Sequence, residues 1–246
     1  MNNKLTLIPL LISLLSFNVS SEEISLVTTN WEPVYGKSLP ENGFFSALAR
    51  EAFNKSGYDM DVKFIPWSRA VETAKKGEFD GVMGAYYTED RSKSFDYSDS
   101  VYAVEEVFVK NVNADIKYSD VNDLKPYVIG GLRGGGQLEE LKNQGFKIQE
   151  TSNDLQSLKK VSAGRIDLVL MGRPQLNLLL KDNPALQKNL EILEPPYKSF
   201  DVFVILSKKR KNSQNNGAII TKFNQSLKEM KANGSYSKIL KRFGQN

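Results

Sequence analysis

Apolar residues recur along the first third of the chain in two alternating periods, one typical of strands and the other typical of helices. Strands are predicted at 24–29, 60–65 and 80–84, and helices at 44–56 and 68–76. Each helix is followed by a glycine, a residue that commonly ends one. The order strand, helix, strand, helix, strand indicates a parallel sheet covered by helices.

The same alternation returns later in the chain, after a β-branched and aromatic strand at 104–110 that leads away from the first unit. Strands are predicted at 127–132, 146–150, 166–171 and 190–193, and helices at 138–143, 154–163 and 174–181. A further strand at 201–207 could carry the chain back to the first unit. Two helices, at 218–233 and 236–243, would then end the chain.

A strand-entry pattern occurs twice, in GEFDGVMGAYYTEDR at 77–91 and in GRIDLVLMGR at 164–173. In each copy a helix ends at a glycine, two residues intervene, and an aspartate leads into an apolar run with a second glycine. The spacing is far longer than a solenoid unit, so it predicts two similar α/β lobes with a cleft between them. We predict one lobe from 22–108 with 203–246, and the other from 109–202.

The first residues have the pattern of a targeting segment. An apolar run at 5–17 follows a lysine, and Val19 and Ser21 suit a signal-peptidase site just before Glu22. A membrane anchor is the alternative, but it needs about 18 to 20 apolar residues, more than this run holds. We predict a cleaved signal peptide at 1–21. Because the chain has no cysteine to carry a lipid anchor, we expect a protein free in the periplasm.

Composition narrows the possible chemistry. The 246 residues are 40% hydrophobic and 25% charged, ordinary for a soluble globular protein. The 33 basic and 29 acidic residues balance too closely to indicate a nucleic-acid partner, and we interpret the basic run KKRK at 208–211 as a solvated loop. Without cysteine or histidine the chain lacks thiolate nucleophiles and the commonest general base and metal ligand. We expect no metal, no cofactor and no catalytic residue.

Seven segments spread over the mature chain carry a resemblance to a known family. They are NWEPVY (30–35), EAFNKSGY (51–58), IPWSRA (65–70), GEFDGVMGAYYTEDR (77–91), FDYSDSVYAVEEVFV (95–109), VIGGLRGGGQ (128–137) and SAGRIDLVLM (162–171). In this order and spacing they resemble the family 3 periplasmic solute-binding proteins, the ligand receptors of polar amino-acid ABC transporters. The resemblance implies a type II-like periplasmic binding protein fold with two α/β lobes, each a mostly parallel sheet flanked by helices. Two strand connections, here near Val107 and Phe203, would join the lobes.

The resemblance also implies residues for an anion. Arg91 is similar to the arginine that clamps the ligand carboxylate, and a planar guanidinium offers paired donors that match a carboxylate. The alternative for Arg91 is a surface ion pair with a nearby acid. Gly134, Gly135 and Gly136 match the loop where family members present backbone N–H groups at a helix N-terminus. The hydroxyl residues common in that loop are replaced here by glycine.

Aromatic residues are candidates for the walls of the cleft, although aromatic residues are often part of a core. The candidates are Trp31, Tyr35, Trp67, Tyr86 and Tyr87. Trp31 and Tyr35 lie in a loop with a proline, where burial in a core is less automatic. Tyr86 and Tyr87 are consecutive, so strand alternation predicts that only one of them faces the ligand.

The second lobe departs from the family. Members that bind α-amino acids usually place an aspartate for the ligand ammonium five residues beyond the motif's first aspartate, and here that position is Gly172, followed by Arg173. We therefore predict that Arg173 adds positive charge to the pocket, which would then prefer an anionic carboxylate to a basic amino acid. Two alternatives stay open: Arg173 points to solvent, or another acid such as Glu32 or Glu194 replaces the aspartate.

The leading hypothesis is a non-catalytic, monomeric receptor that captures a small carboxylate-bearing solute, such as an amino acid, by cleft closure and delivers it to an inner-membrane ABC permease. The same fold could instead dock on a receptor or sensor kinase as a ligand sensor. A third hypothesis is a cyclohexadienyl-dehydratase-like enzyme, with Glu32, Glu89 or Glu194 as the acid. A fourth is an interaction protein that has lost its ligand.

Overall fold

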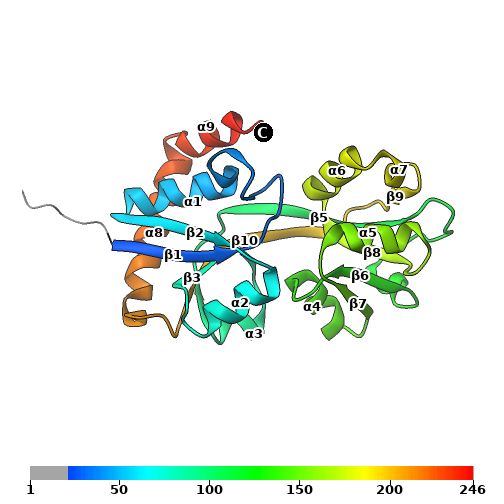
Figure 1. The fold of residues 1–246 in the computed structure, drawn as a ribbon, viewed down its shortest axis with the longest axis horizontal. Helices are drawn as coiled ribbons and strands as arrows, with labels where there is room; N and C mark the ends of the chain where they lie inside the picture. Colours follow the sequence, from blue (N-terminus) through cyan, green and yellow to red (C-terminus); the bar gives the residue numbers. More distant parts are fainter. Residues whose placement is uncertain (1–21, 246) are drawn as a thin grey trace, which may run out of the picture.

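The computed structural model describes residues 22–245, so the predicted signal peptide at 1–21 lies outside the described residues. The described chain forms two α/β lobes side by side, joined by two long strands (Figure 1). The two-lobed fold implied by the resemblance is therefore confirmed. Within residues 22–245, one mixed sheet of ten strands runs through both lobes in the order β2-β1-β3-β10-β5-β8-β6-β7, with β4 beside β10 and β9 beside β5.

The first lobe is a sheet with helices on both faces. Its elements are β1 (Glu22–Thr28), α1 (Phe44–Lys55), β2 (Tyr58–Phe64), α2 (Trp67–Lys75), β3 (Gly81–Tyr86), α3 (Glu89–Ser92), β4 (Phe95–Tyr97), α8 (Asn216–Ala232) and α9 (Ser235–Arg242). Strand β1 pairs in parallel with β2 and β3. Leu26 belongs to the core formed with α1 and α8, whereas Val27, the next residue, belongs to the core formed with α2. A strand covered on both faces is apolar throughout, which explains the continuous apolar runs in the sequence.

The second lobe repeats this arrangement. Its elements are β6 (Val128–Leu132), α4 (Gly136–Asn143), β7 (Lys147–Thr151), α5 (Asp154–Ser162), β8 (Leu168–Gly172), α6 (Arg173–Asp182), α7 (Pro184–Gln187) and β9 (Leu190–Ile192). Strand β6 is parallel to β7 and β8. Leu168 and Leu170 pack with α4 on one face, and Val169 and Met171 pack with α5 on the other.

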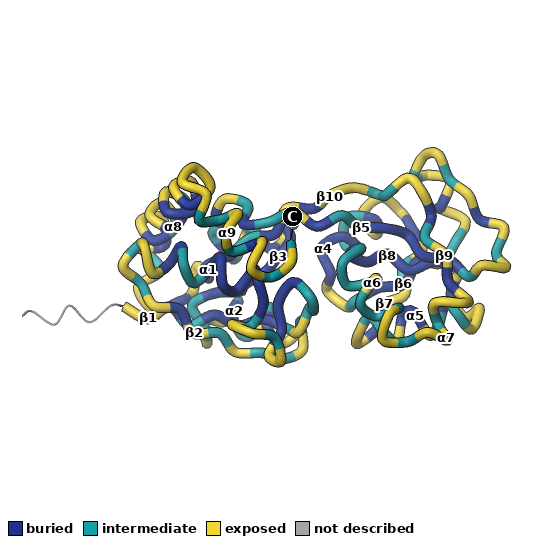
Figure 2. The backbone as a smooth tube through the Cα atoms, turned by 90° about the horizontal axis from the view of Figure 1, so that it is seen from above, coloured by how far each residue is buried: buried dark blue, intermediate teal, exposed yellow. Residues whose placement is uncertain are grey.

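Two ten-residue strands connect the lobes. Strand β5 (Tyr102–Asn111) pairs with β8 in the second lobe, strand β10 (Lys198–Ser207) pairs with β3 in the first, and the two strands pair with each other between the lobes, all antiparallel. Figure 2 shows both strands passing from one lobe to the other. Val107 lies in β5 and Phe203 in β10, the two positions at which the connections were predicted.

The repeated aspartates have the same structural role in both lobes. Asp80, before β3, accepts a hydrogen bond from the Ser25 amide at 2.8 Å, and Asp167, before β8, accepts one from the Val128 amide at 2.7 Å. The Asp80 amide also donates to the Ser25 carbonyl at 2.8 Å, and the Asp167 amide donates to the Val128 carbonyl at 3.2 Å. Each aspartate thus ties the start of a central strand to its parallel neighbour, which gives a physical reason for the repeat.

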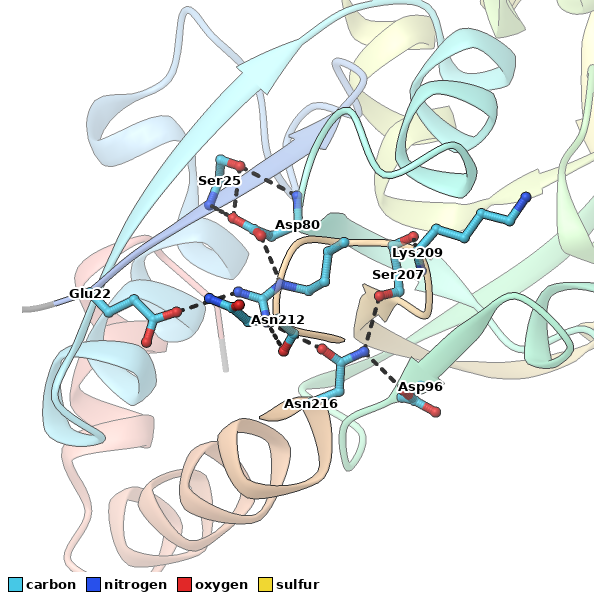
Figure 3. Close-up of polar contacts among 9 residues, drawn as sticks. Glu22, Ser25, Asp80, Asp96, Ser207, Lys209, Asn212 and Asn216 are labelled. Atoms are coloured by element: carbon cyan, nitrogen blue, oxygen red, sulfur yellow. Dashed lines mark hydrogen bonds and ion pairs between the residues drawn. The ribbon is translucent and has the colours of Figure 1, made fainter. Parts of the chain in front are cut away.

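A buried ion-pair network secures the end of β10. The Arg210 guanidinium donates to Asp80 at 2.7 Å and lies 3.5 Å from the Glu22 carboxylate. It also contacts Asn216 at the start of α8, at 3.3 Å. Figure 3 shows Glu22, Asp80 and Asn216 gathered around this guanidinium. The interpretation of KKRK as a solvated loop is therefore wrong for Arg210, which is 5% exposed, because its charge is neutralised inside the lobe.

The longer predicted elements are present, with ends that differ from the prediction by at most three residues. Three short elements were not predicted: α3, β4 and α7, each of three or four residues and too short to show a period. Helix α4 begins at Gly136, two residues before its predicted start, and this places a helix N-terminus in the glycine segment. In the described part of the chain, no helix combines the length and apolar character needed to cross a bilayer.

Candidate ligand-binding cleft

The two lobes face each other across a cleft beside the connecting strands. Residues of both lobes line it, from Trp31 and Arg91 of the first lobe to Gly136 and Gln175 of the second. The structure brings seven of the ten predicted site residues to this cleft: Trp31, Tyr35, Trp67, Tyr86, Arg91, Gly135 and Gly136. Gly134 lies at its edge, whereas Tyr87 and Arg173 do not line it.

Arg91 presents a buried positive charge to the cleft. It lies in α3, whose cap residue Thr88 accepts a hydrogen bond from the Arg91 amide at 3.1 Å. The guanidinium stacks on Trp67, donates to the Tyr86 carbonyl at 2.8 Å, and donates to the Gly134 carbonyl at 2.6 Å. Among residues 22–245 it forms no ion pair, so the alternative of a surface ion pair is not what the structure shows. Burial lowers the pKa of the guanidinium, which nevertheless stays charged at any physiological pH.

Helix α4 directs its N-terminus at the same place. Within the described chain, the amides of Gly136 and Gln137 in its first turn have no acceptor, as expected for the start of a helix. A Cβ at Gly136 would lie 3.1 Å from the Arg91 guanidinium and 3.1 Å from the Tyr86 Cβ. A side chain at this position would crowd Arg91 and Tyr86, so glycine favours the close approach of α4 to Arg91. Two N–H groups and a guanidinium together form a receptor for an anion.

The aromatic residues form the wall of the cleft on the side of the first lobe. The Trp31 ring is edge-on to Tyr35 and Tyr86, with centroids 5.5 Å and 5.7 Å apart. Tyr86 lines the cleft, but Tyr87 is 55% exposed and packs on Tyr97 outside it. Strand alternation separates the two tyrosines as expected, and Tyr87 is placed away from the site.

Hydrogen bonds cross the cleft and hold the lobes in contact. The Trp31 indole donates to the Gln175 side chain of α6 at 2.9 Å. The Trp67 indole donates to the Gly134 carbonyl at 2.9 Å, which also accepts from Arg91. Residues predicted to bind a ligand therefore also join the lobes.

Glu106 is a buried acid at the floor of the cleft that the sequence did not reveal. It lies in β5 and is fully buried, and its Oε1 accepts a hydrogen bond from the Tyr86 hydroxyl at 2.5 Å. Its Oε2 has no hydrogen-bond partner within the described chain. Burial raises the pKa of this carboxyl to about 8, although the Tyr86 hydrogen bond acts in the opposite direction. Burial and the negative Glu106 raise the pKa of Tyr86 as well.

A second acid, Asp154, lines the same cleft from the first turn of α5. Its side chain is half-buried, and removal from water raises the pKa of the carboxyl to about 6, while a hydrogen bond with Gln175 opposes that rise. The negative charge of Asp154 adds to the causes that raise the pKa of Glu106. The cleft therefore contains a positive charge at Arg91 and two acidic side chains, Glu106 and Asp154.

Arg173 is not part of the cleft, so the predicted second positive charge is absent from it. Its guanidinium is paired with Glu105 of β5 and, at 2.9 Å, with Glu194. The strand register explains this placement. Glu106 pairs with Gly172, and successive residues of a strand point to opposite faces of the sheet. Arg173, the residue after Gly172, therefore meets Glu105 on the other face. The alternative acids fail for similar reasons: Glu194 is bound to Arg173, and Glu32 accepts from Ser38 in an exposed contact.

The fold and the bipolar cleft are those of a two-lobed protein with a candidate ligand site between its lobes. Residues 27–246 match the model of the bacterial extracellular solute-binding proteins, family 3, and the chain belongs to this family. The arginine-binding extracellular protein ArtP of Bacillus subtilis is 26% identical over 206 residues, which cover 82% of this chain and 77% of that protein. The probable histidine-binding protein of Neisseria gonorrhoeae is 26% identical over 227 residues, covering 88% and 81%.

The fold is also that of a solved structure, a histidine kinase sensor domain with similarity to periplasmic binding proteins. It matches with a TM-score of 0.76 at 17% identity, over 90% of this chain and 95% of that one. Such a low identity shows the shared fold and no more. The family and the curated relatives are named for binding and not for catalysis.

Glu106, Asp154 and Gln175 are among the cleft residues that sequence reasoning missed. Asp154 and Gln175 lie outside the motifs quoted above, and Glu106 lies inside the segment 95–109 without standing out there. Glu106 interrupts the apolar strand 104–110 as the second of two consecutive glutamates, and one of two neighbours in a strand must face inward. A charged residue in the middle of a buried strand was the signal that could have identified it.

Proposed function

We propose that this protein captures an amino acid or a related small solute bearing a carboxylate, and delivers it to an inner-membrane ABC permease. Arg91 carries the proposal. It is a buried guanidinium in the cleft whose partners in the described chain are neutral carbonyls and an aromatic ring. A ligand carboxylate would supply the missing negative charge and would also accept from the free amides of α4.

The relatives support this class of solute. The two curated relatives are named for binding arginine and, probably, histidine, and both cover more than four-fifths of the present chain. Their shared feature is an α-amino acid ligand. Family membership and the predicted signal peptide together favour a protein that acts in the periplasm as a solute receptor.

Closure of the cleft is the proposed means of capture. The two bodies would be 22–108 with 203–246, and 109–202, rotating about β5 and β10. A ligand that touches Arg91 and α4 contacts both lobes, so it favours the closed arrangement. Small-angle scattering should show a lower radius of gyration when a saturating ligand is added. An unchanged radius would indicate binding to a rigid cleft.

Replacement of Arg91 tests the function directly. Arg91→Ala should weaken the binding of a carboxylate ligand on the order of a hundredfold or more, because a desolvated charge-assisted contact is lost. Arg91→Lys should restore little, since lysine cannot form the bidentate contact. Arg133→Ala is the matched control, because Arg133 is 63% exposed, pairs with Glu150, and lies just outside the cleft. Equal affinity in Arg91→Ala and Arg133→Ala, measured by calorimetry, would remove Arg91 from the site.

A further inference from the structure

The carboxyl group of Glu106 lacks a partner that a buried carboxylate needs. Tyr86 satisfies Oε1, but Oε2 is buried and unpaired within the described chain. An unsatisfied buried acceptor costs about 1 to 3 kcal/mol, and folded proteins keep few of them. Because Glu106 lines the same cleft as Arg91, the missing donor is expected from whatever occupies that cleft.

The register of the sheet shows why Glu106 reaches this place. Strands β5 and β8 pair Glu106 with Gly172, so side chains at these two positions would project from the same face of the sheet. A Cβ built at Gly172 would lie 3.6 Å from the Glu106 Oε1. The carboxyl of Glu106 therefore lies in van der Waals contact with the position of a side chain at 172, beside Val104 and Trp31. An acid is thus present at that point of the cleft, supplied by the neighbouring strand.

No charged or titratable group around Glu106 in the described chain would balance a negative charge on its carboxylate. Tyr86 of β3 donates to it, and Asp154 of α5 adds negative charge. Lys198 of β10 is the cross-strand neighbour of Glu106, but its ammonium is bound to Glu140 at 2.6 Å.

The remaining groups do not neutralise Glu106 either. Arg91 shares the cleft but is bound to backbone carbonyls, and the Tyr35 hydroxyl donates to Gly84. Glu105 and Arg173 pair with each other on the opposite face of β5. In the described chain, then, no cation of the protein is paired with either acid of the cleft.

We propose that Glu106 and Asp154 form an acidic subsite that receives a cationic group of the solute, an ammonium or a guanidinium, and that Glu106 releases its proton to solvent when this group binds. The inference rests on the proposed function, because Arg91 is taken to hold the carboxylate of the same solute. The solute class is then a zwitterion or a basic amino acid. A dicarboxylate without a cation would be rejected, which is the opposite of the anionic preference expected from the sequence.

The subsite makes capture depend on pH. With a pKa of about 8 for Glu106 and about 6 for Asp154, the unliganded pair holds one proton at pH 7. A bound cation favours the ionised carboxylate, so the proton leaves for solvent water. Affinity should therefore rise with pH, by up to about tenfold per unit below pH 8, and should level off above pH 8.

Matched pairs of compounds test the cation requirement. The probes are the twenty standard L-amino acids and, for each one, the carboxylic acid in which hydrogen replaces the α-amino group. We expect thermal stabilisation by one or more amino acids and binding at least a hundredfold weaker by the paired analogue, unless a basic side chain keeps a cation. Equal binding within the pairs would overturn this inference and leave the proposed function standing. No binding by any compound of either set would overturn the proposed function itself.

Calorimetry of the amino acid that binds best tests the proton. Titrations of the unmodified protein in two buffers with different ionisation enthalpies should show release of about one proton per ligand at pH 7 and nearly none at pH 9. Glu106→Gln keeps the shape of the side chain, and should remove both this release and the pH dependence while weakening binding. Glu105→Gln is the control, since it removes the same charge from the opposite face of the same strand.

Two results would contradict the subsite. Proton release that is unchanged in Glu106→Gln would mean that another group titrates. Zero release by the unmodified protein between pH 6 and pH 8 would overturn the inference without any variant, so the test holds even if Glu106→Gln fails to fold. Asp154→Asn should weaken the binding of the same amino acid but retain the proton release, because Glu106 holds the proton at neutral pH.

Discussion

Two buried arginines of the first lobe, Arg210 and Arg91, have opposite surroundings. Arg210 is held by the carboxylates of Asp80 and Glu22, which neutralise its charge inside the fold. Arg91 is as deeply buried, yet it donates to backbone carbonyls and lies over Trp67. Carbonyl groups satisfy its hydrogen bonds but leave its positive charge uncompensated. The buried arginine that lacks a carboxylate partner is the one suited to receive an anion.

Two acids, the partly buried Asp80 and the buried Glu106, differ in the same way. Asp80 accepts hydrogen bonds from the amide and hydroxyl of Ser25 and from Arg210, so its carboxylate is fully used. Glu106 accepts one hydrogen bond, from Tyr86, and has no cationic partner in the described chain. The difference separates structural charges, which are paired within the protein, from charges that a ligand must pair. The predictions below test this separation.

Removal of Arg210 should destabilise the folded protein. Arg210→Met should lower the free energy of unfolding by about 3 kcal/mol, because Asp80 would keep a partly buried charge without its partner. Ligand affinity should be unchanged in the molecules that fold. Chemical denaturation and calorimetry measure the two quantities. If Arg210→Met lost ligand affinity but kept its stability, Arg210 would belong to the ligand site and not to the structural charges.

The pH dependence of stability should identify Glu106 as an unpaired acid. Its pKa is higher in the folded protein, about 8, than the ordinary value of 4.5, so the folded state holds the proton more tightly than the unfolded state. This contribution to stability is complete below pH 4.5, declines as pH rises toward 8, and is constant above that. Between pH 5 and pH 8 we expect a loss of about 3 to 4 kcal/mol in the unliganded protein.

Glu106→Gln should flatten this slope and should make the unliganded protein more stable at pH 8, because the amide has no charge to bury. Glu105→Gln should keep the slope. Denaturant titrations at pH 5, 6.5 and 8 measure the difference between the variants. A slope that survives in Glu106→Gln would have to come from other groups.

Arg91 should behave unlike Arg210 in the same denaturant experiment. Arg91→Ala should change the free energy of unfolding by no more than about 1 kcal/mol, because the lost hydrogen bonds are offset by removal of a charge whose burial is costly. The variant that harms binding most would then harm stability little. A loss as large as that of Arg210→Met would show that Arg91 is mainly structural.

Much of the fold could be predicted from the sequence, because local patterns determine the longer elements. The two apolar periods fixed the strands and helices, and the Asp80 and Asp167 repeats indicated two lobes. The placement of Arg91 in the cleft also followed, since it is close in sequence to the end of a central strand.

The acidic side of the cleft could not be predicted, because it depends on the register between strands far apart in sequence. Nothing local indicates that Glu106 lies beside Gly172, which is 66 residues away, or that Arg173 turns to the opposite face to meet Glu105. Asp154 has an ordinary position for a helix start, and only the packing of α5 places it in the cleft. The prediction that Arg173 adds a positive charge to the pocket failed on these long-range contacts.

The smallest expected effect concerns the contact between the lobes. Trp31→Phe keeps an aromatic ring beside Tyr86 but removes the indole donor that reaches Gln175 across the cleft. One such hydrogen bond contributes about 1 kcal/mol, so the unliganded protein should open more often and affinity should fall by roughly fivefold. Tyr236→Phe removes a comparable bond, at 2.8 Å to the Val101 carbonyl, within the first lobe alone. Small-angle scattering should therefore show a larger radius of gyration for Trp31→Phe than for Tyr236→Phe. Identical radii would mean that the Trp31 contact does not restrain the lobes. The hydrogen bonds from Arg91 and Trp67 to the Gly134 carbonyl would then suffice to hold the lobes together.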